Sequence, residues 1–444
     1  MSNRVYFTKD EFTKANDNCR DRLPFDEDIS VLKKPLSLGS RLIPNRLACQ
    51  AMEGCDGNPD GSPGELTKRR YKRFAEGGAG LIWFEATAVM EEGRANPHQL
   101  YINENTLDSF KREVNDIKEY GLRKNGYEPI VIMQATHSGR YSKPNGTPAP
   151  LIAYNNPLFE KDVPIASDRI VSDEYLDRVL QSLINGASLA ESAGFDGVDI
   201  KCCHRYLCSE LMSAYTRDGR YGGSLENRSR LLREAVEGSI AAPGNNFEVA
   251  TRMNIYDGFP YPYGFGVAKD GSLAFDPDEP VTVIKELLRL GVKLVDLTMG
   301  NPYVNPHVNR PYSVGGYLPP EEPINGVYRM LSGTAAVKRS VPGINIVCSA
   351  LSYLGVAAPN VAAAYINGGG FDIAGFGRQA FAYPDFANDI LKNGEMDPGR
   401  ICLTCSQCTA IMRAGGTPGC AVRDREVYLP IYRKYCVKTD TNRK

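Results

Sequence analysis

Short runs of apolar and β-branched residues recur along the chain, separated by segments whose apolar positions repeat with a helical period. The runs cover residues 46–52, 79–86, 129–135, 196–201, 247–253, 292–298, 344–349 and 371–377. Each run is almost continuously apolar, which is typical of parallel strands buried on both faces. Segments between them, such as DEYLDRVLQSLINGASLAESAG at 173–194, have the pattern of amphipathic helices. This alternation predicts an α/β chain folded as a (β/α)8 TIM barrel.

A doubly wound open sheet is the alternative fold for alternating strands and helices. It is disfavoured because no G-x-G-x-x-G turn follows the first predicted strand, where a dinucleotide-binding sheet would carry its phosphate turn. Two long segments rich in Gly, Pro and aromatic residues, 256–272 and 300–323, each follow a predicted strand. In a barrel such loops lie at the C-terminal face, so we expect the active site there.

The amino-acid composition disfavours nucleic acids and membranes as binding partners. The chain has 444 residues with 52 Lys and Arg against 53 Asp and Glu, so no general basic field favours nucleic acid or an anionic membrane. The N-terminal sequence lacks the apolar core of a signal peptide, and no stretch approaches the ~20 apolar residues of a membrane span. We therefore expect a cytoplasmic protein that acts on a small molecule. In that compartment the 12 cysteines are better read as thiols or metal ligands than as disulfides.

Four cysteines near the end of the chain have regular spacing. Cys402, Cys405, Cys408 and Cys420 form the pattern C-x2-C-x2-C-x11-C. Two-residue loops place successive sulfurs on one side of a tight turn, so four such thiolates can enclose an iron-sulfur cluster. Zinc is the alternative, although zinc sites more often show two separated C-x2-C pairs. We expect a barrel domain at 1–390 and a cluster-binding extension at 391–444 packed on it.

Several longer stretches fall at predicted strand ends and resemble one known family. The strongest is YGGSLENRSRLLRE at 221–234, supported by FEATAV at 84–89, QATHSGRY at 134–141 and GFGRQAFAYPDF at 375–386. Together they resemble the old yellow enzyme family of NADH:flavin oxidoreductases, over residues ~30 to 425. The likeness is greatest to its iron-sulfur branch, which contains 2,4-dienoyl-CoA reductase and trimethylamine dehydrogenase. The resemblance implies FMN and a 4Fe-4S cluster on Cys402, Cys405, Cys408 and Cys420.

The resemblance also implies which side chains contact the FMN. An amide can pair with the polar edge of the flavin, and a fixed guanidinium can stabilise the charge that a reduced flavin carries. Backbone donors and a second cation suit the phosphate. The residues carried over for these contacts are Met52, Ala86, Gln134, Arg252, Ser349, Ala350, Gly377 and Arg378.

The catalytic positions depart from the family pattern. The family typically has a His-x-x-His or His-x-x-Asn pair after the fourth strand, whereas this chain has Lys201 and His204. Tyr206 matches the tyrosine that protonates substrate, and His307 follows the sixth strand, where dienoyl reductases carry an auxiliary histidine. Glu53 stands where the first strand commonly ends in threonine, so its carboxylate either alters the flavin potential or faces away. A lysine ammonium favours a carboxylate or another charged oxygen on the substrate.

The reaction implied is hydride transfer from reduced FMN to an activated C=C bond, with Lys201 and His204 polarising an oxygen and Tyr206 as proton donor. Two alternatives stay open: an amine or C–H dehydrogenase that passes electrons out through the cluster, and a non-catalytic electron-transfer barrel. The chain ends 24 residues after Cys420 without a second nucleotide-binding pattern. We therefore expect an external electron partner, such as ferredoxin, flavodoxin or a reductase subunit, with direct reduction by NAD(P)H as the alternative. A homo-oligomer is compatible with the sequence.

Overall fold

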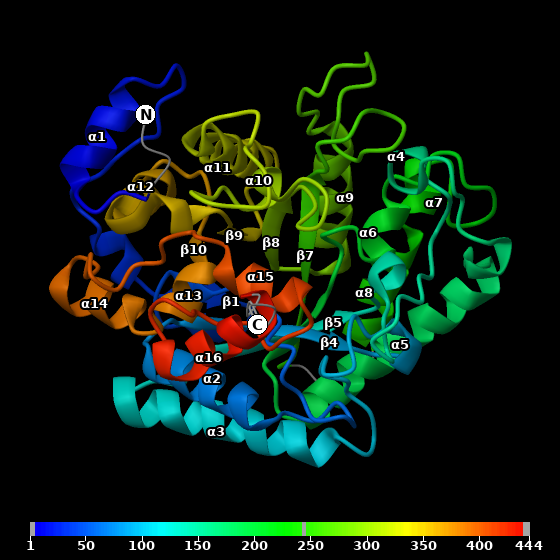
Figure 1. Cartoon of the computed structure of the whole chain (residues 1–444), viewed down its shortest axis with the longest axis horizontal. Coiled ribbons are helices and arrows are strands. Elements are labelled where there is room, and N and C mark those ends of the chain that lie inside the picture. The colour runs from blue at the N-terminus through cyan, green and yellow to red at the C-terminus, as the bar shows by residue number, and fades with distance from the viewer. Residues whose placement is uncertain (1–4, 242–245, 438–444) are drawn as a thin grey trace, which may run out of the picture.

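The computed structural model describes residues 5–241 and 246–437, and within these ranges the chain folds around a closed barrel (Figure 1). The strands lie in the order β10-β3-β4-β5-β6-β7-β8-β9, with parallel pairing throughout. They are β3 (Leu47–Cys49), β4 (Leu81–Ala88), β5 (Ile130–Thr136), β6 (Gly197–Ile200), β7 (Glu248–Tyr256), β8 (Leu294–Met299), β9 (Asn345–Cys348) and β10 (Ile373–Phe376). Each strand overlaps one predicted apolar run, so the (β/α)8 barrel is confirmed.

Helices follow the strands in turn. The principal ones are α2 (Glu65–Glu76), α3 (Leu107–Asn125), α5 (Asp173–Ser192), α8 (Arg230–Ala241), α9 (Asp278–Leu290), α11 (Pro323–Ser340), α12 (Ala358–Asn367) and α14 (Phe386–Asn393). Helix α5 illustrates why they form: the Ser172 hydroxyl accepts the Tyr175 backbone N–H at 3.2 Å, and acidic side chains occupy the first turn. Leu176, Val179 and Leu183 are buried on one face of α5 and join the core between helices and barrel.

Shorter elements connect and extend this frame. They are α1 (Lys9–Asp17), α4 (Pro157–Glu160), α6 (Leu207–Leu211), α7 (Leu225–Arg228), α10 (Pro306–Asn309), α13 (Arg378–Ala382), α15 (Gln407–Arg413), α16 (Arg425–Cys436), β1 (Leu36–Leu38), β2 (Arg41–Ile43), and the 3-10 turns η1 (Ser30–Lys33), η2 (Glu91–Gly93), η3 (Gly139–Tyr141), η4 (Ser167–Arg169) and η5 (Leu351–Ala357). No described helix is long and apolar enough to cross a lipid bilayer.

The N-terminal end of the barrel is sealed by a hairpin. Strands β1 and β2 pair antiparallel, and their buried Leu38 and Ile43 pack with Leu81, Ile130 and Leu294, which lie at or near the first positions of barrel strands. This apolar cluster keeps water out of the barrel interior from that end. Access is therefore left to the opposite end, where the long loops follow β7 and β8.

The C-terminal segment packs against the open end of the barrel. The Ser313 backbone N–H donates to Thr404 Oγ1 at 3.0 Å, and Arg413 Nη2 donates to the Pro302 carbonyl at 3.0 Å. From helix α2, Arg69 forms an ion pair of 2.7 Å with the buried Asp424. In Figure 1 the red helix α16 accordingly lies beside α2, and α15 lies in front of the barrel. This segment thus forms one wall of the barrel mouth.

Candidate active site

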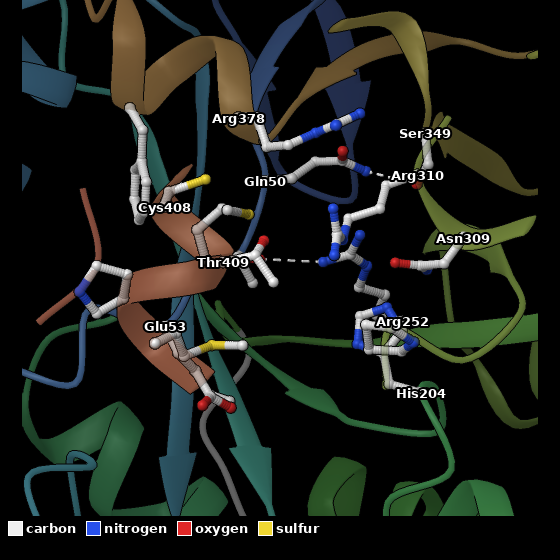
Figure 2. A pocket seen from close by; sticks show the side chains of 18 of the residues that line it. Gln50, Glu53, His204, Arg252, Asn309, Arg310, Ser349, Arg378, Cys408 and Thr409 are labelled. Carbon is white, nitrogen blue, oxygen red and sulfur yellow. Dashed lines mark hydrogen bonds between the residues drawn. The ribbon is translucent and has the colours of Figure 1, made fainter. Parts of the chain in front are cut away.

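Most of the predicted site residues line one cavity at the C-terminal end of the barrel. Its volume is about 1050 Å³, counted with the open space at its mouth. Every residue predicted to contact FMN lines it, and so do three of the predicted catalytic residues, Lys201, His204 and Tyr206. Figure 2 shows Cys408 of α15 on one side of this cavity and Arg252 and His204 on the other. The cavity therefore lies between the barrel strands and the cysteine-containing segment.

Gln134 is held at the end of β5 by a buried carboxylate. Its Nε2 donates to Asp199 Oδ2 at 2.6 Å, and Trp83 Nε1 donates to the same oxygen at 2.7 Å. Burial raises the pKa of Asp199 to about 6, against the opposing effect of these donors. Because Asp199 takes only one of the two amide N–H groups, the second N–H and the amide oxygen of Gln134 are left for a ligand in the cavity.

A second buried carboxylate fixes Arg252 on β7. Arg252 Nε lies 3.0 Å from Asp296 Oδ2, and Arg252 Nη1 donates to the Ala51 carbonyl at 3.2 Å. Gln50 bridges this group to the neighbouring strand, because its Nε2 donates both to Asp296 Oδ1 at 2.9 Å and to Ser349 Oγ at 2.8 Å. Burial raises the pKa of Asp296 to about 7, although Arg252 opposes the shift. The guanidinium is thereby oriented before any ligand binds.

The turn after β6 holds His204 in an unusual backbone conformation. His204 and Arg205 have φ values of 64° and 61°, which are left-handed and rare for residues other than glycine. The fully buried Arg205 forms an ion pair of 3.0 Å with Asp257, which helps to hold this turn. His204 Nε2 is buried without a hydrogen-bond partner among the described residues. Burial and nearby cations lower its pKa, so the imidazole is neutral.

Lys201, Glu53 and Tyr206 form one connected group. The Tyr206 hydroxyl donates to Glu53 Oε1 at 2.9 Å, and Lys201 Nζ lies 3.6 Å from the same oxygen. Lys201 Nζ also lies 3.6 Å from the centre of the Tyr206 ring, which is a cation–π contact. Glu53 therefore does not face away from the site, because its carboxylate accepts the hydroxyl of the predicted proton donor. Burial lowers the pKa of Lys201, with Glu53 opposing.

Tyr303 extends this group from the loop after β8. Its hydroxyl lies 3.1 Å from that of Tyr206, and its ring stacks on Tyr141 with 3.9 Å between centroids. Burial and the negative charge of Glu53 raise the pKa values of both Tyr206 and Tyr303 well above their usual range. Both phenols are therefore neutral near physiological pH. Tyr303 was not predicted, because one tyrosine in a tyrosine-rich loop carries no signal of its own.

Two arginines line the cavity without an acidic partner. Arg310, from the loop after β8, and Arg378, after β10, form no ion pair with any described carboxylate, and Arg378 Nη1 has no hydrogen-bond partner among the described residues. Burial and the charge of Arg378 lower the pKa of Arg310 to about 10. Two neighbouring cations, the buried Arg378 and the half-buried Arg310, suit a bound anion. Arg310 was missed, because its loop has no regular period to indicate which side chains turn inward.

His307 does not line this cavity. It lies on α10, where its Nδ1 hydrogen-bonds the Tyr317 hydroxyl and its ring packs edge-on against the Tyr317 ring. Asn309, two residues further along, does face the cavity. Residues two apart on an α-helix point about 200° apart, so a helix that directs Asn309 inward directs His307 away. The structure thus brings Lys201, His204 and Tyr206 together but leaves His307 outside.

The four spaced cysteines line a neighbouring cavity of about 350 Å³, together with Arg378 and Phe381. Cys408 lines both this cavity and the one in the barrel. Backbone N–H groups point at two of the sulfurs: Thr404 N lies 3.4 Å from Cys402 Sγ, and Arg423 N lies 3.3 Å from Cys420 Sγ. Over residues 5–241 and 246–437, no set of three or more His, Cys, Asp or Glu side chains is arranged to hold a metal ion.

The comparison with protein families gives the identity of the barrel. Residues 31–266 match the model of the NADH:flavin oxidoreductase / NADH oxidase family. The chain belongs to this family. It is a flavin-dependent oxidoreductase, and the predicted old yellow enzyme relationship is confirmed. A curated relative, the NADPH dehydrogenase of Halalkalibacterium halodurans, is 28% identical over 274 residues, which cover 61% of this chain and 72% of that protein.

Solved structures give the same fold over nearly the whole chain. A 2-naphthoyl-CoA reductase complex superposes with a TM-score of 0.71 and 20% identity, covering 92% of this chain and 58% of that one. Histamine dehydrogenase from Rhizobium sp. 4-9 superposes with a TM-score of 0.66 and 19% identity, covering 88% of this chain and 52% of that one. The family member described here therefore spans only a little over half the length of these two structural neighbours.

Proposed function

We propose that this protein is an ene-reductase dependent on FMN and a 4Fe-4S cluster. In this proposal the substrate is a small molecule with a C=C bond activated by a carbonyl or carboxylate. The observation that carries it is the shared lining of the two cavities. The barrel cavity is lined by a cation, a neutral histidine and a tyrosine, and it shares Cys408 with the cysteine cavity.

The residues present fit an FMN. Ala86 and Gly377 leave room for a flat ring, and the free amide oxygen of Gln134 can accept from it. Arg252, which is oriented by Asp296, would offset negative charge on the ring. Arg378 and Arg310 lack acidic partners and would hold the phosphate. FMN bound in this way would supply hydride chemistry.

The cysteine pattern favours a cluster over a zinc ion. Cys402, Cys405, Cys408 and Cys420 have three-then-one spacing, whereas zinc sites more often show two separated C-x2-C pairs. Backbone N–H groups donate to Cys402 and Cys420. Such N–H···S contacts are typical around iron-sulfur clusters, where they help set the potential. A cluster here would supply single electrons.

Three side chains of the cavity, His204, Lys201 and Tyr206, can act on the substrate. The neutral His204 has an unpartnered Nε2 that can hydrogen-bond the substrate oxygen, and Lys201 adds positive charge beside it. Both interactions draw electron density from the C=C bond and stabilise the enolate oxygen that forms on reduction. Tyr206 is neutral and can donate its hydroxyl proton to the substrate carbon.

The electron donor and the direction of reaction are further parts of this proposal. We propose that a separate carrier, such as a ferredoxin, a flavodoxin or a reductase subunit, supplies the electrons, with NAD(P)H as the second candidate. The second candidate function is an amine or C–H dehydrogenase that passes electrons outward. It is favoured by the likeness to histamine dehydrogenase and by the carboxylate behind Tyr206, which would suit proton removal.

The test is the direction in which substrates change the flavin. Anaerobically purified protein, reduced chemically, is mixed with a panel of enoates and enones, and the oxidised form is mixed with a panel of amines. The proposal expects an activated alkene to restore the oxidised flavin spectrum. Reduction of the oxidised flavin by an amine, with no response to any alkene, would instead establish the dehydrogenase function.

A further inference from the structure

We propose that Met412 on α15 is a specificity-determining residue, which limits the size of the apolar group that a substrate carries beside its reacting carbon. Arg413, the next residue, is in this proposal the positioning residue that holds Met412 in place. The inference rests on the ene-reductase function proposed above for the kind of substrate. It extends that function by naming the substituent that the site accepts.

Helix α15 and the turn after it contribute part of the lining of the barrel cavity. Figure 2 shows Cys408 and Thr409 of α15 on the side of the cavity opposite to Arg252. The lining residues that come from this segment are Cys408, Thr409, Met412 and Pro418. The space left for a substrate therefore depends on the C-terminal segment as well as on the barrel strands.

The contacts of Arg413 place Met412 on the substrate side of the cavity. Arg413 Nη2 donates to the Pro302 carbonyl at 3.0 Å and to the Tyr303 carbonyl at 3.5 Å. The Tyr303 hydroxyl in turn lies 3.1 Å from that of Tyr206, the proposed proton donor. Since Met412, Pro302 and Tyr303 all line the cavity, the end of α15 is tied to the part of the lining beside the proton donor.

This part of the lining is apolar, and we call it the apolar wall. It is formed by Met412, Pro302, Pro418 and the ring of Tyr303. Such a surface favours an alkyl or aryl substituent over a charged one, because burying apolar area is favourable and desolvating a charge is costly. The thioether of methionine also packs well against aromatic rings. Lys201 is left to hold the oxygen at the other end of the substrate.

Two hydrogen bonds fix the C-terminal segment on either side of Met412. Arg413 ties it to the loop after β8, and Thr417 Oγ1 donates to the Cys55 carbonyl, after β3, at 3.2 Å. Arg413 is exposed, so its replacement leaves the packed core intact. A wall held at both ends keeps its distance from the proton donor, and this lets Met412 set a size limit.

The variant for this test is Met412→Trp, which adds bulk to the apolar wall without changing the charge. Holoprotein with reduced flavin is mixed anaerobically with crotonate or cinnamate, which differ only in a methyl or a phenyl group on the C=C bond. We expect the second-order rate constant of flavin reoxidation to fall at least about tenfold for cinnamate and less than about twofold for crotonate. Ala414→Trp, at an exposed position outside the cavity lining, is the matched control and should keep both rate constants.

Met412→Ala should act in the opposite sense, because it widens the space beside the wall. We expect the rate constant for 4-phenylcinnamate, divided by that for crotonate, to rise at least about threefold. Arg413→Ala should raise the same ratio, since it frees α15 from the Pro302 and Tyr303 carbonyls. Arg413→Lys, which can still donate to a carbonyl, should restore the ratio. A merely structural role of Arg413 would lower both rate constants together and leave the ratio unchanged.

A second readout does not need turnover. Crotonate and cinnamate are titrated into oxidised holoprotein, and each dissociation constant is taken from the change in the flavin absorption spectrum. Met412→Trp should raise the dissociation constant of cinnamate by at least about tenfold and leave that of crotonate near the wild-type value.

The outcomes separate this inference from the proposed function. If both enoates reoxidise the wild type and Met412→Trp keeps the wild-type ratio of rate constants, the size limit is wrong and the ene-reductase function stands. If the enoates bind with the expected selectivity but never reoxidise the flavin, the size limit stands and the ene-reductase function fails. Enoates that neither bind nor react with the wild type would overturn both.

Discussion

Lys201 Nζ lies 3.6 Å from Glu53 Oε1 and 3.6 Å above the ring of Tyr206. The cation that replaces the usual first histidine is therefore already placed between an anion and a π-system. Its charge is partly offset before substrate arrives, which lets a lysine remain at a buried position. It can still add a third partner, since an ammonium has three donors.

Lys201→Met should impair reduction of anionic substrates more than of neutral ones. Removing the ammonium leaves a substrate carboxylate and Glu53 without a cation, and we expect kcat/KM to fall by about 2–4 kcal/mol in free-energy terms. The loss should appear mainly in KM for an enoate and be smaller for a neutral enone. Lys201→Arg, which keeps the charge, should retain part of the activity. Equal effects on enoate and enone would contradict a role in anion binding.

Arg310→Met should weaken FMN binding. Arg310 is a half-buried cation without a described acidic partner, and its loss removes a charge-assisted contact that is worth about 1.5–3 kcal/mol. We expect at least a tenfold rise in the FMN dissociation constant, about 1.4 kcal/mol, measured by quenching of flavin fluorescence on titrating apoprotein. The exposed Arg112→Met, on α3, is the control for lost positive charge. Unchanged affinity in Arg310→Met would place the phosphate elsewhere.

Cys405→Ser should remove iron and leave the flavin. The sulfur of Cys405 lines the cysteine cavity but not the barrel cavity, so its loss breaks the ligand set without touching the flavin residues. We expect iron and sulfide content to fall while FMN content is kept, by chemical analysis of anaerobically prepared protein. Cys436→Ser, outside the four-cysteine pattern, should keep both. Stoichiometric zinc in the wild type would refute the cluster.

His137 should make the fold sensitive to acid. It is 4% exposed, its Nδ1 accepts the Gly139 backbone N–H at 3.1 Å, and burial lowers its pKa to about 4 from a usual value near 6.5. Between these values the unfolded chain binds more protons than the folded one, so stability falls as pH drops from about 6.5 to 4. The full effect is about 3 kcal/mol.

Urea unfolding of His137→Gln across this pH range measures that contribution. The variant should lose less stability than the wild type on acidification, because a glutamine takes up no proton. His98→Gln, at an exposed position, is the control and should follow the wild type. An identical pH slope in His137→Gln and the wild type would show that other groups govern acid unfolding.

The barrel and its strand-end residues could be predicted because their signals are local. Buried parallel strands are apolar on both faces, so runs such as 129–135 mark them directly. A residue near the end of such a run, such as Gln134 or Arg252, is carried to the C-terminal mouth by the fold itself. The carboxylates beneath them, Asp199 and Asp296, were not predicted, because in sequence they are single polar interruptions of apolar strands.

The loops could not be predicted in the same way. Arg310 and His307 lie three residues apart in one proline-rich loop, yet only Arg310 lines the cavity. Which side chain turns inward is decided by the four-residue helix α10 and by contacts with distant segments, such as that of Arg310 with Ser406. Glu53 is similar: its partners, Lys201 and Tyr206, are more than a hundred residues away in sequence.

The most direct measurement is the anaerobic half-reaction of Tyr206→Phe. The protein with reduced flavin is mixed with an activated alkene in a stopped-flow instrument, and the return of the oxidised flavin spectrum is followed. We predict that the wild type is reoxidised and that Tyr206→Phe slows this step by about 10²–10⁴-fold, with flavin reduction by the donor unchanged. Tyr120→Phe, away from the cavity, should match the wild type. Reoxidation at the wild-type rate in Tyr206→Phe, or no reoxidation of the wild type by any alkene, would contradict the ene-reductase proposal.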